Sequence, residues 1–357
     1  MNCSLSKNIW KPLISALKSN PSNLTELDFR WNRDLQDLGF PNLCGFLESP
    51  DYRLQTLKLK DCSLSEIICK ALSSSKNHNL SSLTQLDLSG TNLQLTGFLH
   101  LCGFLESPDC RLQTLRLKNC SLSEISCEVL GSVLKNNPSR LTELDLSNNT
   151  IQDSGFLHLR GFLESPDCRL QTLRLWDCSL SEISCKVLGS GKNNTSRLAK
   201  LDLSGNKIQD SGFLHLLGFL ESPDCRLQTL RLENCSLSEI SCRIMGSALK
   251  NNPSRLTELN LSWNTIQDSG FLHLRGFLES PDCRLQTLRL WNCSLSKISC
   301  AALISTLNLN PSHLKKLDLR NNNLHSSDVQ QLQDLVKSPN SKLQTLRWEG
   351  KALPFIN

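Results

Sequence analysis

The sequence predicts an α/β solenoid, in which every repeat contributes one short strand and one helix. An eleven-residue frame, L-x-x-L-x-L-x-x-[CN]-x-L, carries this prediction, and Leu112 to Leu122 is one copy of it. The frame starts twelve times at intervals of 28 to 30 residues, so residues 1–357 are expected to form a single repeat domain. The starts are Leu24, Leu54, Leu83, Leu112, Leu141, Leu170, Leu198, Leu227, Leu256, Leu285, Leu314 and Leu343.

Each frame alternates apolar and polar residues as a short strand does, because successive side chains of a strand point to opposite faces. Leu115 and Leu117 are expected to point into the core, and Thr114, Arg116 and Lys118 to point outward. The frame therefore predicts one buried and one exposed set of side chains in every repeat.

A helix is expected after each strand, in two kinds of repeat that alternate along the chain. In the L-Q-T-L-R-L kind, Ser123 is expected to cap a helix from Glu124 to Leu134, which Asn136-Asn137-Pro138 ends. In the L-T-E-L-D-L kind, Asp153 is expected to cap a helix that Ser165-Pro166 ends. Parallel strands stack about 4.8 Å apart and helices need about 8–10 Å, so the array should curve into a horseshoe. Its parallel strands should lie on the concave face and its helices on the convex face.

The first residues match only part of a repeat. Met1 to Leu5 resembles the end of the frame, so the chain is expected to begin in the middle of a repeat, with Lys7 to Ser19 as its first helix. The strand at Leu24 should then present an open edge, through which two chains can associate. We expect the chain to be a fragment of a longer protein.

Composition excludes several classes of partner. The net charge is +5 with a sequence pI of about 8.4, and acidic and basic residues interleave without blocks, so no nucleic-acid partner is expected. The sequence has no apolar run of the length that spans a membrane and no pattern of a secretory signal. We therefore expect a cytoplasmic protein with no membrane partner.

Fourteen of the seventeen cysteines recur at fixed repeat positions, in three series that step by 57 or 58 residues. Thiols so placed are expected to be small buried hydrophobic residues in a reducing compartment, not a disulfide scaffold. No C-x-x-C pair occurs, which disfavours zinc, and no cofactor is expected. The three series are Cys62, Cys120, Cys178, Cys235, Cys293; Cys69, Cys127, Cys185, Cys242, Cys300; and Cys110, Cys168, Cys225, Cys283.

The frame, the 28/29-residue alternation and the long helices resemble ribonuclease-inhibitor-type leucine-rich repeats. The pairing of Leu141 to Ile151 with Gly161 to Leu175 resembles, more closely, the leucine-rich-repeat region of fish-type NACHT-LRR (NOD-like) receptors of innate immunity. This resemblance implies a ligand-sensing and autoinhibitory region whose partners are a protein ligand or other receptor domains. The sequence has no G-x-x-x-x-G-K-[ST] motif, so nucleotide binding by a NACHT domain is not expected here.

An enzyme is not expected. His100, His158, His215 and His273 occupy one helix position in alternate repeats, so they cannot converge on one metal or nucleophile. No G-x-S-x-G, H-E-x-x-H or Cys/His catalytic arrangement occurs.

The outward strand positions differ in what they predict. The middle one alternates acidic and basic residues, as in Asp87, Arg116 and Asp145, and predicts lateral ion pairs between neighbouring strands that mainly hold register. The next two positions vary and contain tryptophans, which have no core to fill on an exposed strand face and are enriched in protein interfaces. The candidate protein-binding residues of the concave face are Trp31, Lys118, Trp176, Glu233, Trp263, Trp291 and Arg320.

The sequence thus predicts a non-enzymatic leucine-rich-repeat scaffold that binds a protein through its concave face. The alternative is a free-standing enzyme inhibitor of the ribonuclease-inhibitor type. The outward columns of the twelve frames hold twelve basic and twelve acidic residues, and this balance fits neither a nucleic acid nor a strongly basic ribonuclease.

Overall fold

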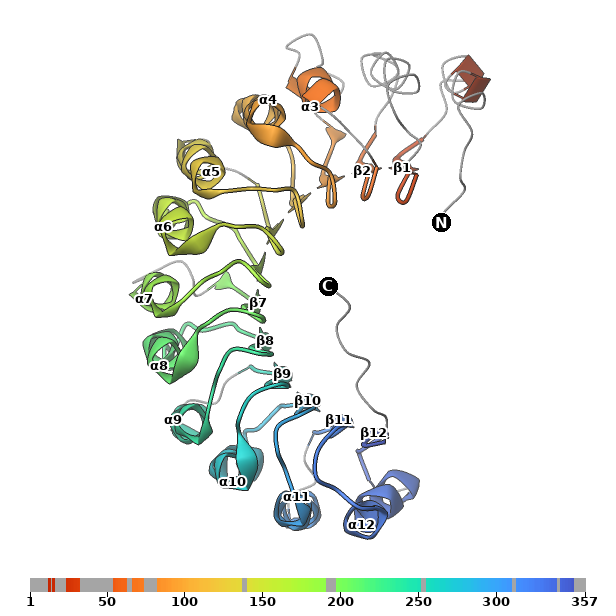
Figure 1. Ribbon diagram of the computed structural model, residues 1–357, viewed down its shortest axis with the longest axis vertical. Coiled ribbons are helices and arrows are strands. Elements are labelled where there is room, and N and C mark those ends of the chain that lie inside the picture. The colour runs from red at the N-terminus through yellow and green to blue at the C-terminus, as the bar shows by residue number, and fades with distance from the viewer. Residues whose placement is uncertain are drawn as a thin grey trace. The chain divides into compact units, whose positions relative to one another are not determined.

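The computed structural model describes residues 12–13, 15–16, 24–32, 54–62, 66–73, 82–136, 140–190, 197–251, 255–309, 313–338 and 341–349. The chain divides into two compact units, residues 1–179 and 180–357. Within each unit the strands lie on one side and the helices on the other (Figure 1). The repeating α/β solenoid predicted from the frame is confirmed, with one three-residue strand in each repeat.

Unit 1 contains strands β1 to β6 and helices α3 to α6. Of the helix expected from Lys7 to Ser19, only residues 12–13 and 15–16 are described, and they are helical, while Met1 to Leu5 lies outside the described residues. The elements are β1 Glu26–Asp28, β2 Thr56–Lys58, α3 Glu66–Ser73, β3 Gln85–Asp87, α4 Gln94–Glu106, β4 Thr114–Arg116, α5 Glu124–Asn136, β5 Glu143–Asp145, α6 Gln152–Leu163 and β6 Thr172–Arg174.

Unit 2 has the same alternation, with strands β7 to β12 and helices α7 to α12. The elements are α7 Glu182–Ser190, β7 Lys200–Asp202, α8 Gln209–Leu220, β8 Thr229–Arg231, α9 Glu239–Asn251, β9 Glu258–Asn260, α10 Gln267–Leu278, β10 Thr287–Arg289, α11 Lys297–Leu309, β11 Lys316–Asp318, α12 Ser326–Lys337 and β12 Thr345–Arg347.

Strands within a unit pair in parallel and in register, so that the central leucines of neighbouring frames are partners. Leu86, Leu115 and Leu144 are matched in this way, and each is fully buried. Burying a leucine side chain contributes about 1.5–3 kcal/mol, and here the next repeat supplies the cover. Stability therefore comes from the contact between repeats.

The ninth frame position fixes the turn that follows each strand. Asn149 Oδ1 accepts hydrogen bonds from the backbone N–H groups of Cys120 and Leu122, both at 3.0 Å. Its Nδ2 donates to the carbonyl oxygens of Leu117 and Leu146 at 2.8 and 2.7 Å. A buried amide can satisfy donors and acceptors of two repeats at once, which explains why asparagine alternates with cysteine here.

Cysteine at that position makes fewer hydrogen bonds. Cys120 is buried, and its Sγ donates to the carbonyl oxygen of Leu88 at 3.1 Å. Burial raises the pKa of Cys120 to about 12, so the unreactive thiol form prevails. The prediction that the cysteines are mostly buried is confirmed for the described part of the chain, where Cys110 and Cys225 are half-buried; their reduced state stays a prediction.

Helix N-termini are capped partly by side chains from another helix. Ser238 Oγ accepts a hydrogen bond from Ile240 N at 3.1 Å, as expected from its equivalence to Ser123. Asp210, the counterpart of Asp153, lies inside the first turn of α8 and accepts hydrogen bonds from the backbone N–H groups of Ser238 and Ser241 at 3.0 and 3.2 Å. The expectation that Asp153 caps its own helix is therefore wrong, because α6 begins one residue earlier, at Gln152. The aspartate of this motif caps the next helix of the solenoid.

The helices pack in close pairs. A Cβ atom placed on Gly131 of α5 would lie 2.3 Å from the carbonyl oxygen of His158 in α6, and Gly246 of α9 stands in the same relation to His273 of α10. Only glycine permits this approach of two helix backbones. The repeating unit of the helical layer is therefore a pair of repeats, which matches the alternation of the two frames in the sequence.

Candidate protein-binding surface

The candidate surface is the strand face of each unit, defined by the outward side chains of the frames. On the strand face of unit 1, Glu143 lies between two guanidinium groups. Its Oε1 accepts a hydrogen bond from Arg116 Nε at 2.9 Å and another from Arg174 Nη1. Burial opposes ionisation of Glu143, but the bonds and charges of Arg116 and Arg174 together lower the pKa of its carboxyl.

Unit 2 repeats this cluster. Glu258 Oε1 accepts hydrogen bonds from Arg231 Nη2 at 3.0 Å and from Arg289 Nη1. Burial again opposes ionisation, and the two arginines outweigh it, so the pKa of Glu258 is lowered. Each cluster contains two arginines and one glutamate and carries one surplus positive charge.

The prediction that acidic and basic residues at the middle outward position pair between neighbouring strands is mostly wrong. Asp145 does not face its arginine neighbours; its Oδ1 accepts the backbone N–H of Ser147 at 3.0 Å, and Asp87 does the same with Ser89. Among the described residues, Asp202 and Arg231 form one lateral pair, at 3.8 Å. An aspartate has a backbone donor two residues ahead, which is a closer and more ordered partner than an exposed arginine. The arginines at the middle position therefore bind a glutamate of the adjacent strand, two residues before the aspartate or asparagine that they were expected to face; Glu143 and Glu258 are these glutamates.

Two of the four candidate tryptophans lie in unit 1. Trp31 is 42% exposed, and Lys60 Nζ lies 4.4 Å from the centre of its ring. Trp176 is half-buried, and Lys118 Nζ reaches within 4.6 Å of its ring across the intervening repeat. The structure thus brings together the predicted residues Lys118 and Trp176, whereas Trp31 pairs with a lysine that was not predicted.

The other two tryptophans touch each other in unit 2. The rings of Trp263 and Trp291 meet edge to face with their centroids 5.4 Å apart, and Arg320 Cζ lies 4.9 Å from the Trp291 ring. Asp318 holds Arg320 in place through hydrogen bonds of 2.9 and 2.6 Å. We name Trp263, Trp291 and Arg320 the aromatic cluster, which contains three of the seven predicted residues.

Glu233 lies on the same strand face. Burial raises the pKa of its carboxyl, and the hydrogen bond of 2.8 Å from Asn260 Nδ2 to Glu233 Oε2 offsets this only in part. Trp291 Nε1 is buried and makes no hydrogen bond within the described residues. A buried N–H without an acceptor costs free energy, so the placement of this ring is not explained by hydrogen bonding.

Two tryptophans have a left-handed backbone. The eighth frame position has a positive φ in each repeat where the structure describes it, and most of these repeats place Asn, Asp or Gly there. Trp31, with φ +70°, and Trp263, with φ +59°, are the exceptions. A bulky residue pays about 1–2 kcal/mol for this conformation. Such strain is typical of positions that serve function.

An internal near-duplication isolates the unusual positions. Residues 140–179 of unit 1 and 255–294 of unit 2 are identical except at three positions. All three lie on the strand face and are Asp145/Asn260, Asn148/Trp263 and Asp177/Asn292. The unit 2 copy therefore has two carboxylates fewer and one tryptophan more than the unit 1 copy. Comparison of these two segments is the signal in the sequence that singles out Trp263.

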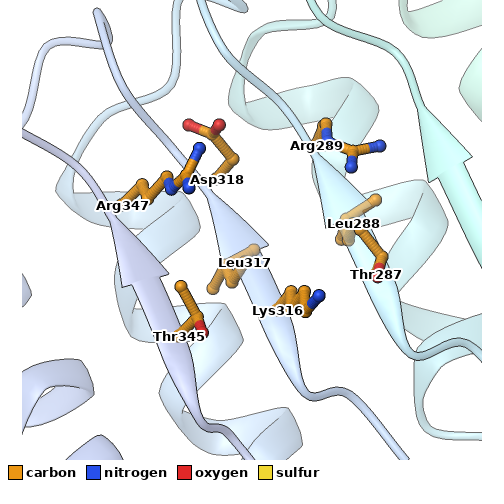
Figure 2. Close-up of a pocket in the computed structure, with 8 residues that line it drawn as sticks. All are labelled: Thr287, Leu288, Arg289, Lys316, Leu317, Asp318, Thr345 and Arg347. Atoms are coloured by element: carbon orange, nitrogen blue, oxygen red, sulfur yellow. The ribbon is translucent and has the colours of Figure 1, made fainter.

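A hollow lies beside the aromatic cluster, over the strands β10, β11 and β12. Figure 2 shows three charged side chains toward one end of these strands and Thr287, Lys316 and Thr345 toward the other. The lining residues are Thr287, Leu288, Arg289, Lys316, Leu317, Asp318, Thr345 and Arg347. Asp318 is the single carboxylate of this lining, and Arg320 already occupies its oxygens. We name this site the basic hollow; reading the sequence did not find it.

No group of His, Cys, Asp and Glu residues that could hold a metal ion occurs in the part of the chain that the structure describes. None of the described helices is long and apolar enough to cross a membrane. The surface offers ion pairs, aromatic rings and hydroxyl groups, which suit recognition of another molecule.

The fold and the strand face define a leucine-rich-repeat protein. A family model described as Leucine Rich repeat matches residues 20–40, 139–156, 198–214 and 254–271, and one described as Leucine Rich Repeat matches residues 313–335. The crystal structure of an internalin (inlF) from Listeria monocytogenes str. 4b F2365 covers 98% of this chain and 96% of its own, with a TM-score of 0.56 and 16% identity. That likeness shows the fold.

Closer relatives show the family. Ribonuclease inhibitor of Sus scrofa is 37% identical over 345 residues, which cover 97% of this chain and 74% of the inhibitor. The chain belongs to the ribonuclease-inhibitor family of leucine-rich-repeat proteins. The human NACHT, LRR and PYD domains-containing protein 12 is 40% identical over 334 residues, or 94% of this chain, but the match spans only 31% of that longer protein. The resemblance to NOD-like receptors is therefore confirmed for the repeat region.

Proposed function

We propose that this chain is a non-enzymatic, cytoplasmic protein-binding scaffold, the ligand-sensing repeat region of a NOD-like receptor. The aromatic cluster on the strand face of unit 2 is the proposed main contact. The observation that carries this proposal is Trp263. It occupies a left-handed position with φ +59°, and the otherwise nearly identical segment of unit 1 has Asn148 there.

Physical chemistry supports a binding role for this tryptophan. Asparagine adopts the left-handed region at low cost, so a scaffold under no other demand would keep it. A tryptophan beside a second tryptophan and an arginine offers the residue types that most often dominate protein interfaces. Trp176, with Lys118 above it, and the exposed Trp31 are proposed as secondary contacts in unit 1.

The test is capture of partner proteins from cell lysate on the immobilised chain. Substitution of Trp176, Trp263 and Trp291 by Ala is expected to abolish capture of at least one protein, while circular dichroism and the melting temperature stay close to those of the wild type. The matched control is Leu157→Ala, which removes an exposed apolar side chain of helix α6 and should leave capture unchanged. Capture that persists with all three tryptophans removed would place the binding site elsewhere.

A second candidate is a free-standing enzyme inhibitor of the ribonuclease-inhibitor type. The coverage of 74% of the pig inhibitor at 37% identity favours it. The two carboxylates that unit 2 lacks relative to unit 1 disfavour a strongly basic enzyme as its target. Inhibition of a ribonuclease at an equimolar ratio would support this candidate over the receptor region.

A further inference from the structure

The charge of the basic hollow indicates the chemistry of the partner that the proposed scaffold binds. This inference rests on the proposed function. Lys316 and Arg347 line it from neighbouring strands, and neither forms an ion pair within the described residues. Arg289, also in the lining, shares one glutamate, Glu258, with Arg231. The hollow thus carries positive charge that the protein itself leaves uncompensated.

The near-duplication supports the same sign of charge. Where unit 1 has Asp145 and Asp177, unit 2 has Asn260 and Asn292. Both asparagines are bound by neighbouring polar groups: Asn260 Nδ2 donates to Glu233, and Asn292 Oδ1 accepts a hydrogen bond of 3.0 Å from Asn321 Nδ2. The segment 255–294 therefore has two carboxylates fewer than its unit 1 counterpart on the face that leads to the basic hollow.

The hollow is continuous with the aromatic cluster. Asp318 lines the hollow and grips Arg320, and Arg320 lies over Trp291, which meets Trp263. Arg289 and Trp291 are two residues apart on β10 and the turn that follows it. A ligand in the hollow would thus reach the two rings along one surface.

We propose that the basic hollow and the aromatic cluster together bind an extended, acidic segment of a protein partner. Its carboxylates would pair with Lys316 and Arg347 and accept hydrogen bonds from the hydroxyl groups of Thr287 and Thr345. An apolar side chain of the same segment would rest on Trp263 and Trp291. A polyphosphate chain suits the site less well, because it has no apolar side chain to rest on the rings of Trp263 and Trp291.

The probe is a fluorescein-labelled twelve-residue peptide that alternates Glu with Leu and Ser, measured by fluorescence anisotropy against the full chain. Peptides with Gln or Lys in place of Glu are the ligand controls. We expect the Glu peptide to bind at least tenfold more tightly than the Gln peptide, with affinity that falls as salt rises. Equal binding of the Glu and Gln peptides, or tighter binding of the Lys peptide, would overturn the proposal.

Two protein variants locate the site. Lys316→Ala combined with Arg347→Ala is expected to weaken the Glu peptide at least fivefold. The control, Lys186→Ala combined with Lys250→Ala, removes the same charge from exposed positions on helices α7 and α9 of unit 2 and should change affinity less than twofold. Asn292→Asp gives unit 2 the carboxylate that unit 1 has at Asp177, keeps an oxygen that accepts the hydrogen bond from Asn321, and is expected to weaken the peptide about threefold. Unchanged affinity in both the Lys316/Arg347 and Asn292 variants would contradict the assignment.

A single-stranded oligonucleotide tests whether the basic hollow binds a nucleic acid instead of an acidic protein segment. Oligonucleotide binding that exceeds that of the Glu peptide and disappears in the Lys316/Arg347 variant would overturn the peptide in favour of a nucleic acid. Failure here is distinguishable from failure of the proposed function. Lysate capture that depends on the tryptophans, together with no Glu-peptide binding, would reject only the acidic segment.

Discussion

Residues 140–179 and 255–294 are two copies of one stretch of solenoid that carry different surfaces. In both copies a glutamate joins two arginines, as Glu143 and Glu258 do, and the helices share the same apolar residues. Only the unit 2 copy has a pair of contacting tryptophans. The comparison teaches that the repeated residues build the scaffold, while the three positions that differ change the charge and shape of the strand face, which is the surface proposed for recognition.

The largest expected effect concerns the helix that packs against each copy, α5 in unit 1 and α9 in unit 2. Gly131→Ala and Gly246→Ala should each destabilise the protein by about 2–3 kcal/mol, because the new methyl group meets a carbonyl oxygen of the adjoining helix. Urea denaturation monitored by circular dichroism measures both. Gly276→Ala is the matched control: its nearest neighbour would be 4.0 Å away, and alanine favours a helix by about 1 kcal/mol. Clearly unequal losses of unfolding free energy in Gly131→Ala and Gly246→Ala would show that the two helix pairs do not pack equivalently.

The next effect concerns the paired arginine clusters and depends on pH. The pKa of Glu258 is lower in the folded chain than in the unfolded one, so its contribution is fully present above the unfolded pKa of about 4.3. It is lost as the pH falls through the folded pKa. Glu258→Gln is expected to cost about 1 kcal/mol at pH 7 and almost nothing at pH 3, with Glu143→Gln behaving alike. A cost that does not change with pH would refute the ionic origin of the clusters.

A smaller change is expected in the stability of Trp263→Asn. Relief of the left-handed strain, about 1–2 kcal/mol, opposes the loss of the ring contact with Trp291, about 0.5–1.5 kcal/mol. The free energy of unfolding should therefore stay within about 1 kcal/mol of the wild type. A loss of about 3 kcal/mol, the size expected for a core aromatic residue, would mean that Trp263 serves the fold.

The smallest effect has the opposite sign from that of the arginine clusters. Burial raises the pKa of Glu233, so its carboxylate is disfavoured in the folded chain, and stability is lost as the pH rises through the folded pKa. Glu233→Gln keeps an acceptor for Asn260 and is expected to stabilise the protein by about 0.5 kcal/mol at pH 7 and not at pH 4. Thermal melting at the two pH values tests this. A lower melting temperature for the variant at pH 7 would contradict it.

Much of the fold could be predicted from the sequence, because each frame predicts one strand and the adjacent repeat buries the leucines of that strand. The buried leucines and cysteines followed from position alone. The ladder of ion pairs predicted at the middle outward position was wrong. An aspartate there accepts a hydrogen bond from a backbone N–H within its own turn, as Asp145 does from Ser147. The capping of α9 by Asp210 was also out of reach, because it joins residues 28 and 31 positions apart.

The candidate surface was predicted in part. Four tryptophans were found because tryptophan is unusual on an exposed strand, but which of them touch depends on geometry between repeats. The sequence does indicate the left-handed conformation of the eighth frame position, because Asn, Asp and Gly occupy it in most repeats. Trp31 and Trp263 are exceptions to that pattern. Lys316 and Arg347 gave no signal, since a lysine or arginine on a strand is ordinary until its missing partner is seen.

The most direct test of the central claim is the affinity of Trp263→Asn for a protein captured by the wild-type chain, measured with purified components. This variant gives unit 2 the residue that unit 1 has at the same position. We predict at least a tenfold loss of affinity, and a smaller loss when Trp176 in unit 1 is replaced by Ala. Affinity equal to that of the wild type would contradict the claim that the changed positions of unit 2 serve recognition.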